Sequence, residues 1–294
     1  MSKELNFQYP SIYMQARTNS SVYQKANHAL LIANLIILVA AAGIEAFKIE
    51  WLSNLYPKTV LLSASILLAI ITKKLSLEEK WYAARSLSET VKTLIWRYRM
   101  GAAPFNSSGV EQGLLLLERL EAACLESNSL IGSNKFHLNK NDPLLAEIKH
   151  AEDLSTDNIT TYIENRLTPQ LKWYSTKAKR NSTMSRVFFA TFITCNFFAV
   201  LCSAWQETDT SFTLPITGLL IAISTALIGW IESKKYSELA AAYSLTHGEI
   251  ELLHSDIHDI SSRENFSAFV NDAESLFSRE HTQWAAKRRY IRKI

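Results

Sequence analysis

Residues 73–105 read KKLSLEEKWYAARSLSETVKTLIWRYRMGAAPF, a segment rich in charged and aromatic side chains that directly follows an apolar stretch. Apolar residues recur in it at spacings of three and four, which predicts a helix with one buried face. Gly101 and Pro104 mark the expected end of that helix. We therefore expect a cytosolic helix that is continuous with a membrane span and packs against a neighbour. The apolar face consists of Leu87, Val91, Leu94, Ile95 and Tyr98.

The chain has 294 residues, and its most prominent feature is a set of four apolar runs, at residues 29–47, 55–72, 187–205 and 212–231. A run of about 20 such residues is long enough to cross a hydrocarbon core of about 30 Å. The second run is the weakest because Pro57 and Lys58 interrupt its start. Helices buried in a soluble bundle are the alternative, but such helices usually keep a polar face. The runs therefore predict a polytopic membrane protein of the all-α class, with two hairpins.

Positive charge is distributed unevenly around the runs. Lysines and arginines border one end of the two hairpins, whereas the turn of the second hairpin carries Glu207 and Asp209. By the positive-inside rule, both termini and the middle of the chain are expected in the cytosol. A cleaved signal peptide is the alternative for the first run, but the preceding stretch is too long and polar for one. The bordering cations are Lys25, Lys73, Lys74, Lys177, Lys179, Arg180, Arg186, Lys234 and Lys235.

The arrangement of hairpin and helix occurs twice. Residues 83–88 (AARSLS) align with residues 241–246 (AAYSLT), and each stretch follows a hairpin and a Lys-Lys pair. This repeat predicts two halves, residues 1–153 and 154–294, each with two spans continued by long cytosolic helices that form a helical bundle. The cytosolic helices are expected at residues 73–105 and 110–126 in the first half, and at 157–186 and 232–290 in the second.

Short sequence patterns predict where these helices begin, bend and pack. The patterns are the spacing of apolar residues, helix-capping residues and a proline inside a helical stretch. They predict a buried stripe at Leu114, Leu117 and Leu120, a short helix at residues 144–153, a cap at Asp157, a kink at Pro169, and a capping box of Ser261 and Glu264.

The sequence carries no recognised catalytic arrangement. It has no phosphate-binding glycine loop, nucleophile elbow, zinc-protease motif or dinucleotide motif. The net charge of +3 is too small to indicate nucleic-acid binding, and the three cysteines have neither metal-binding nor redox spacing. His247, Glu251, His254 and His258 share a helical stripe, but a solvated face explains them better than a metal does. We expect no enzyme, no metal and no cofactor.

Polar residues at membrane depth are the candidates for a pore or a gate, because a polar group in hydrocarbon is costly unless it faces water or a neighbour. Hydrogen bonding between packed helices is the alternative use of such groups. Asn34 and Asn196 are the strongest candidates. The full set is Asn34, Glu45, Thr194, Asn196, Thr217, Ser224 and Thr225. Small residues expected at a helix-packing face are Gly218, Ala222, Ala226 and Gly229.

The segment at residues 73–105 also carries groups suited to an anionic ligand. Arginine forks match phosphate oxygens, and aromatic faces accept nucleobases. Interfacial anchoring and ion pairing with Glu78, Glu79 and Glu89 are the alternative. The candidates for binding a cytosolic ligand, or for coupling it to the spans, are Trp81, Arg85, Lys92, Trp96, Arg97, Tyr98 and Arg99.

Four stretches of the sequence carry a family resemblance. In the first half they are YPSIYMQARTNSSVYQ at residues 9–24 and WYAARSLSETVKTLIWRYRMGAAPF at residues 81–105. In the second half they are RLTPQLKWYSTKAKRN at residues 166–181 and SREHTQW at residues 278–284. The chain thereby resembles the SLATT family, the SMODS- and SLOG-associating two-transmembrane effector domains of prokaryotes, as two different SLATT-type halves in tandem.

The resemblance implies a membrane effector of anti-phage defence. Such effectors are expected to form homo-oligomeric pores or ion channels in the bacterial inner (plasma) membrane, and to depolarise the infected cell in abortive infection. A separately encoded nucleotidyltransferase is the implied source of a nucleotide or oligonucleotide second messenger, which would act as activator or inhibitor. The alternative is a non-conducting membrane scaffold or sensor that recruits a cytosolic partner.

Overall fold

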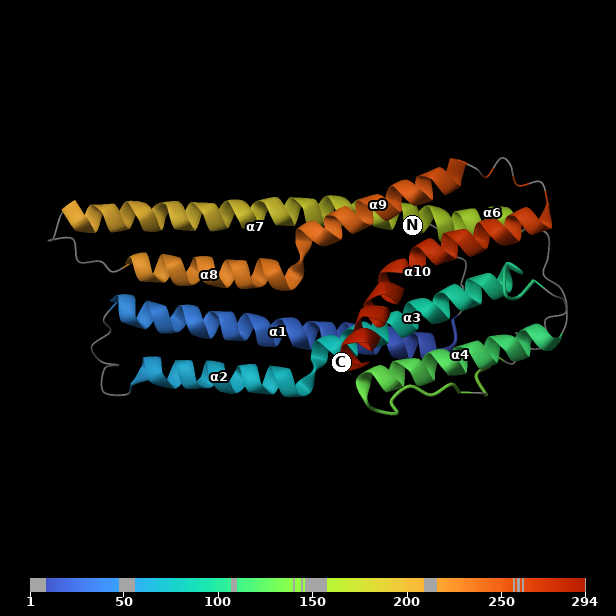
Figure 1. Cartoon of the computed structure of the whole chain (residues 1–294), viewed down its shortest axis with the longest axis horizontal. Coiled ribbons are helices and arrows are strands. Elements are labelled where there is room, and N and C mark those ends of the chain that lie inside the picture. The colour runs from blue at the N-terminus through green and yellow to red at the C-terminus, as the bar shows by residue number, and fades with distance from the viewer. Residues whose placement is uncertain are drawn as a thin grey trace. The chain divides into compact units, whose positions relative to one another are not determined.

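The computed structural model describes residues 9–47, 56–106, 110–139, 141–143, 145, 158–208, 216–255, 257, 260 and 262–293, and the regular elements among them are all helical (Figure 1). The all-α prediction is confirmed. The chain divides into two compact units, which do not coincide with the two halves of the sequence. The span unit consists of Lys25–Ser76 and Lys177–Ala242, and the helical unit of Met1–Gln24, Leu77–Thr176 and Tyr243–Ile294. The boundary expected between residues 153 and 154 lies outside the described residues.

Four helices form the span unit: α1 (Ser11–Phe47), α2 (Pro57–Leu75), the greater part of α7 (Thr168–Thr208), and α8 (Ile216–Lys234). Each of the four is long and apolar enough to cross a membrane, so the protein is a multi-pass membrane protein. The helices lie side by side (Figure 1), with contacts from α1 to α2, from α1 to α8, and from α7 to α8.

Small side chains fill the interior of the span unit. The buried residues among those described there are Ala41, Ala46, Ser65, Ala199 and Ser224. Large apolar side chains point outward instead, as Ile66, Phe197 and Ile221 show with exposed fractions of 64%, 58% and 52%. In hydrocarbon there is no hydrophobic force between helices, so close approach over small residues is what holds them together. The outer surface is suited to lipid or to other apolar helices.

The chain leaves each hairpin through a break in the helix. Ser76 has φ 48° and separates α2 from α3 (Leu77–Arg99), and Lys235 has φ 50° and separates α8 from α9 (Tyr236–Ser255). A left-handed residue other than glycine costs about 1–2 kcal/mol and interrupts a right-handed helix. The expectation that the helix of residues 73–105 is continuous with its span is therefore wrong. By contrast, α1 and α7 run without a break from one unit into the other.

The helical unit is organised around α3. This helix packs against both α4 (Val110–Ile131) and α10 (Arg263–Lys293). The predicted face of α3 is confirmed, because Leu87, Val91, Ile95 and Tyr98 lie in the hydrophobic core and Leu94 packs against it. The predicted stripe of α4 is wrong at Leu114, which is 59% exposed. The core residues of α4 are Leu116, Leu120 and Cys124.

The second half adds two helical segments to the same unit, and aromatic rings meet between them, as Tyr162 does with Phe266 and Phe269. It begins with α6 (Asn158–Tyr162) and a turn of π-helix, η2 (Ile163–Leu167), which closes with a hydrogen bond from the Thr168 N–H to the Ile163 carbonyl. Pro169 follows this turn, in the first turn of α7, and the kink expected there stays a prediction. Ser262 caps α10, because its hydroxyl accepts from the Asn265 N–H at 3.1 Å. The predicted caps at Asp157 and Ser261 and most of the helix at residues 144–153 lie outside the described residues.

Candidate functional site

A buried ion pair lies at the centre of the helical unit. The Arg166 guanidinium is 1% exposed and the Glu274 carboxylate is fully buried. Arg166 donates from Nε to Oε1 and from Nη2 to Oε2 of Glu274, both at 2.7 Å. Such a two-pronged pair fixes the orientation of both side chains as well as their distance. Burial lowers the pKa of Arg166, but the charge and hydrogen bonds of Glu274, together with Tyr162 and Glu89, raise it by more, so the arginine stays charged.

The carboxylate of Glu274 accepts two further hydrogen bonds. The Tyr162 hydroxyl donates to Oε1 at 3.0 Å, and the Thr93 hydroxyl donates to Oε2 at 2.9 Å. The ring of Phe277 lies 4.8 Å from the guanidinium carbon of Arg166. Burial, followed by the negative charge of Glu274, raises the pKa of Tyr162 well above its ordinary value, so the phenol remains a donor. We call Thr93, Tyr162, Arg166 and Glu274 the buried cluster.

The local structure explains why these side chains meet. On α10, Glu274 interrupts an apolar stripe of Phe266, Val270, Ala273 and Phe277, so the helix turns its carboxylate into the core. Tyr162 and Arg166 lie at the start and within the π-helical turn, both facing inward. Thr93 comes from the buried face of α3. The cluster therefore ties together α3, η2 and α10, which are far apart in the sequence.

Lys92 and Gln170 extend the cluster at its edge. With its amide oriented to satisfy both neighbours, the Gln170 side-chain oxygen accepts from Lys92 Nζ at 3.2 Å and from Arg166 Nη1 at 2.9 Å. Burial lowers the pKa of Lys92 to about 8, and the positive charge of Arg166 adds to the effect. Lys92 is thus a cation in an environment that disfavours its charge, where an approaching anion would be stabilised.

The lowered pKa of Lys92 predicts a specific pH dependence of stability. Between about pH 8 and the ordinary pKa of 10.5, the unfolded chain holds a proton on Lys92 that the folded chain has released. Stability due to this group therefore rises with pH across that window. We expect Lys92→Met to be more stable than the wild type at pH 7, and the difference to shrink towards pH 9.5. Thermal unfolding of both proteins in detergent from pH 7 to 9.5 checks this, and a constant difference across the range contradicts it.

Three of the predicted ligand residues have their side chains engaged inside the helical unit. Trp96 is 1% exposed and donates from Nε1 to the Tyr9 hydroxyl at 2.9 Å. Arg97 donates from Nη2 to the Ser275 hydroxyl at 2.9 Å and to the Asn271 carbonyl at 3.3 Å. Burial lowers the pKa of Arg97. Tyr98 is buried with its ring edge-on to Phe105.

The remaining ligand candidates are less enclosed. Trp81, Arg85 and Arg99 are partly buried, and the Trp81 ring stacks on Tyr82 with centroids 4.5 Å apart. Among the candidates, Lys92 has the clearest electrostatic reason to attract an anion. Ligand binding by any of these residues stays a prediction.

The pore candidates fall into two classes by their hydrogen bonds. Three of them stay within their own helix: Thr194 binds the Ala190 carbonyl, Asn196 that of Phe192, and Thr225 that of Ile221. In the other class, three side chains bind a side chain of a neighbouring helix, and one has no partner among the described residues. Asn34 accepts from Ser65 at 2.7 Å, Glu45 pairs with Lys58, Thr217 donates to Gln206 at 3.4 Å, and the buried hydroxyl of Ser224 has no partner among the described residues.

The predicted packing residues lie on α8. A Cβ added at Gly229 would lie 3.6 Å from a methyl carbon of Leu35, so this glycine is at the contact between α8 and α1. A Cβ added at Gly218 would have no atom within 4 Å. Ala222 and Ala226 are partly buried. On the other side of this contact, a Cβ at Gly43 would meet Leu219 at 3.8 Å. Both distances are ordinary van der Waals contacts, so Gly229 and Gly43 lie at the contact between α1 and α8 and an alanine would fit at either position.

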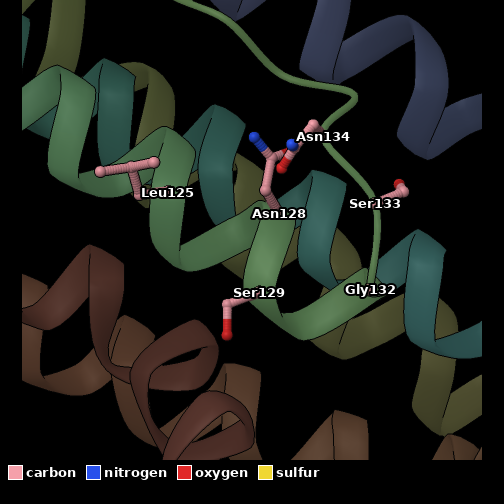
Figure 2. A pocket seen from close by; sticks show the side chains of 6 residues that line it. All are labelled: Leu125, Asn128, Ser129, Gly132, Ser133 and Asn134. Carbon is pink, nitrogen blue, oxygen red and sulfur yellow. The ribbon is translucent and has the colours of Figure 1, made fainter.

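A surface hollow of about 460 Å³ lies at the C-terminal end of α4 (Figure 2). Asn128, one of its polar side chains, is already hydrogen-bonded, because it donates to the Phe136 carbonyl at 2.7 Å and accepts from two backbone N–H groups of the following loop. The hollow therefore reflects how this loop is anchored. Within the described part of the chain, no group of His, Cys, Asp and Glu side chains is placed to hold a metal, and His258 lies outside that part.

Sequence reasoning missed the buried cluster except through the family motif that begins at Arg166. One signal was available, since Glu274 occupies a position where the apolar stripe of α10 requires a hydrophobic residue. A buried charge in such a stripe needs a partner of opposite sign. Nothing local identified that partner, which lies 108 residues away in the chain.

Comparison with known families matches two separate regions of the chain. Residues 10–144 match the model described as SMODS and SLOG-associating 2TM effector domain 3, and residues 162–284 match SMODS and SLOG-associating 2TM effector domain 1. No curated protein and no solved structure matches the chain. The buried cluster draws on both matched regions, with Thr93 in the first and Arg166 and Glu274 in the second. It joins the two domains inside the helical unit.

Proposed function

Because the chain belongs to the SLATT family, with two different SMODS- and SLOG-associating 2TM effector domains in tandem, we propose that it is a pore-forming effector of anti-phage defence. Several copies assemble in the bacterial inner membrane, with both termini in the cytosol, and open an ion channel under the control of a nucleotide-derived signal. The resulting depolarisation ends the infection with the death of the cell. The proposed activity is conduction, and no catalytic step is part of it.

The observation that carries the proposal is the composition of the span unit. Its buried described residues are alanines and serines, and polar groups such as Asn34, Asn196 and Ser224 occur at membrane depth. Four spans packed on small residues leave little room for an ion between them, so we place the conducting path between copies of the chain. The apolar outer surface supports this, since it can meet either lipid or a neighbouring copy.

Control by a nucleotide is supported by the position of Lys92. Its ammonium lies beside the ion pair that joins the two domains, and an incoming phosphate would offset the repulsion from Arg166. A ligand bound there would act on α3 and on the first turn of α7, and α7 continues without a break into a span. This gives the signal a physical route from the cytosol to the membrane.

Ion flux from liposomes that contain the purified full chain tests the proposal. We expect flux that changes at least about tenfold when the cognate nucleotide is added, and native mass measurements that show an oligomer. Lys92→Met is expected to lose the nucleotide response but keep basal flux. Lys172→Met, which removes an exposed lysine on α7, is the matched control and is expected to respond normally. A monomer without flux in every ligand state would contradict the pore.

A non-conducting scaffold is the second candidate, and one observation favours it. Leu245 and Leu252 lie one heptad apart on α9 and are 63% and 70% exposed in the helical unit. Exposed apolar residues at such spacing are suited to binding another helix. A stable cytosolic partner recovered with the full chain, lost in a Leu245→Ser and Leu252→Ser double variant, and combined with absence of flux would support this function.

A further inference from the structure

Two serines occupy equivalent places in the two hairpins. Ser65 in α2 and Ser224 in α8 each lie eleven residues before the left-handed residue that ends the hairpin, Ser76 or Lys235. Both serines are buried, with exposed fractions of 7% and 3%. The repeated structure therefore presents the same buried hydroxyl twice in the membrane.

Two asparagines are the corresponding neighbours on the partner helices. In the first hairpin, Ser65 donates directly to Asn34 at 2.7 Å. In the second, α7 and α8 run antiparallel, and two contacts fix their register: Gln206 with Thr217, and Phe188 with Trp230. Between these contacts, the register places Ser224 opposite the turn of α7 that contains Asn196 and the buried Ala199. Asn196 is thus the counterpart of Asn34.

The second pair differs from the first because its hydrogen bond is not made. Asn196 donates from Nδ2 to the Phe192 carbonyl of its own helix at 2.8 Å. The hydroxyl of Ser224 is buried and has no partner among the described residues. The threonines of the same helices, Thr194 and Thr225, satisfy theirs by binding the carbonyl four residues before. A buried hydroxyl without a partner is unfavourable in hydrocarbon, so a bound water molecule would stabilise Ser224.

We propose that Ser224 and Asn196 form a water-binding site at membrane depth between α7 and α8, at the place where the first hairpin has a direct Asn–Ser hydrogen bond. A water molecule in a protein typically makes about three hydrogen bonds. The Ser224 hydroxyl and the Asn196 side chain supply two, and a backbone carbonyl of α8 can supply the third. The two hairpins therefore have different roles: the first is closed by its own side chains, and the second is hydrated.

The role of this water in conduction rests on the pore proposed above, but the site itself does not. Because the site is buried between α7 and α8, its oxygens would meet the hydration shell of a passing ion only where these two helices move apart at the path between copies. The second hairpin is then the conducting face of each copy, whereas the first hairpin is a packing element.

Cysteine accessibility tests the site directly. Cys124, Cys195 and Cys202 are first replaced by alanine, and Ser224→Cys or Ser65→Cys is then introduced into the full chain in liposomes. A charged methanethiosulfonate reagent modifies thiolates, which form only in contact with water. We expect Ser224→Cys to react at least about tenfold faster than Ser65→Cys, its matched control in the other hairpin. Equal rates at the two positions would overturn contact of the site with bulk water in the open assembly, whereas the bound water itself is tested by the stability measurement below.

Stability offers a second measurement in case a cysteine variant folds poorly. Ser65→Ala removes a hydrogen bond made within the chain and is expected to lower the midpoint of thermal unfolding by about 2–4 °C. Ser224→Ala removes a hydroxyl bound only to water and is expected to lower the midpoint by less than half as much. An equal loss in both variants would contradict the inference. Absence of flux together with the expected asymmetry would contradict the pore and leave the water site supported.

Discussion

Glu274→Ala is expected to lower the free energy of unfolding of the helical unit by about 3–5 kcal/mol. The substitution leaves the Arg166 guanidinium buried without its counter-charge, and it also removes the acceptor of Tyr162 and Thr93. Removing one partner of a buried pair costs more than the pair contributes as a whole, because the remaining charge stays out of water. Denaturant unfolding of the purified full chain in detergent, followed by near-ultraviolet circular dichroism, measures the loss.

Two further variants separate the unpaired charge from the general effect of a substitution. Replacing both partners, as Arg166→Met with Glu274→Leu, is expected to restore part of the stability, since apolar residues of similar volume remove both charges while Tyr162 and Thr93 still lack their acceptor. Glu264→Ala, at an exposed position of the same helix, is expected to change the free energy of unfolding by less than about 0.5 kcal/mol. A Glu274→Ala protein as stable as Glu264→Ala would show that the ion pair is not formed.

Trp96→Ala is expected to lower the free energy of unfolding by about 3–5 kcal/mol. The indole is 1% exposed, lies edge-on to Tyr162 with centroids 5.7 Å apart, and donates to the Tyr9 hydroxyl. Its removal leaves a large cavity next to the buried cluster, and it leaves the Tyr9 hydroxyl without its donor. Thermal and denaturant unfolding of the full chain measure the effect.

The Trp96 variant also decides between two roles for the tryptophans of α3. Trp81→Ala is the matched control, because Trp81 is only partly buried and its loss is expected to cost less than half as much stability. Trp96→Phe is expected to recover part of the loss by filling most of the cavity. If Trp96→Ala instead kept wild-type stability and lost only the nucleotide response, the side chain would be a ligand contact and its buried position would be wrong.

The sequence was sufficient for the spans because length and composition alone determine them. Runs such as residues 187–205 have no other stable environment at that length, and α7 and α8 contain the two strongest runs. The breaks at Ser76 and Lys235 were not predicted. Neither residue is a glycine or a proline, and no local signal distinguishes a left-handed serine or lysine from a helical one.

The error on α4 has a different cause. Residues 114–117 are four consecutive leucines, so helical spacing fits more than one face equally well. Packing against α3 decides the matter by burying Leu116, Leu120 and Cys124, and it leaves Leu114 in solvent. Only a tertiary contact could choose between these faces.

The candidate site could be predicted only in part, for a related reason. Lys92 and Trp96 were identified by residue type on one helix, but the sequence could not show that Lys92 lies at the edge of a buried cluster while Trp96 is enclosed. That difference depends on α10 and η2, whose residues follow α3 by more than 60 positions. Glu274 interrupts an apolar stripe and so indicates a buried partner, but Arg166 looks like an ordinary surface charge until both are placed in the same core.

The contrast between continuous and broken helices has a consequence for how the chain can change in length. α7 has 41 residues without a break, so one residue inserted near the middle of it would rotate one end against the other by about 100°. Residues of α7 on the two sides of the insertion would then no longer share one helix face. An insertion beside Ser76 or Lys235 falls at a break between two helices, so it leaves the rotational order of side chains within each helix unchanged. Relatives of this protein should therefore vary in length at the breaks and keep α7 constant.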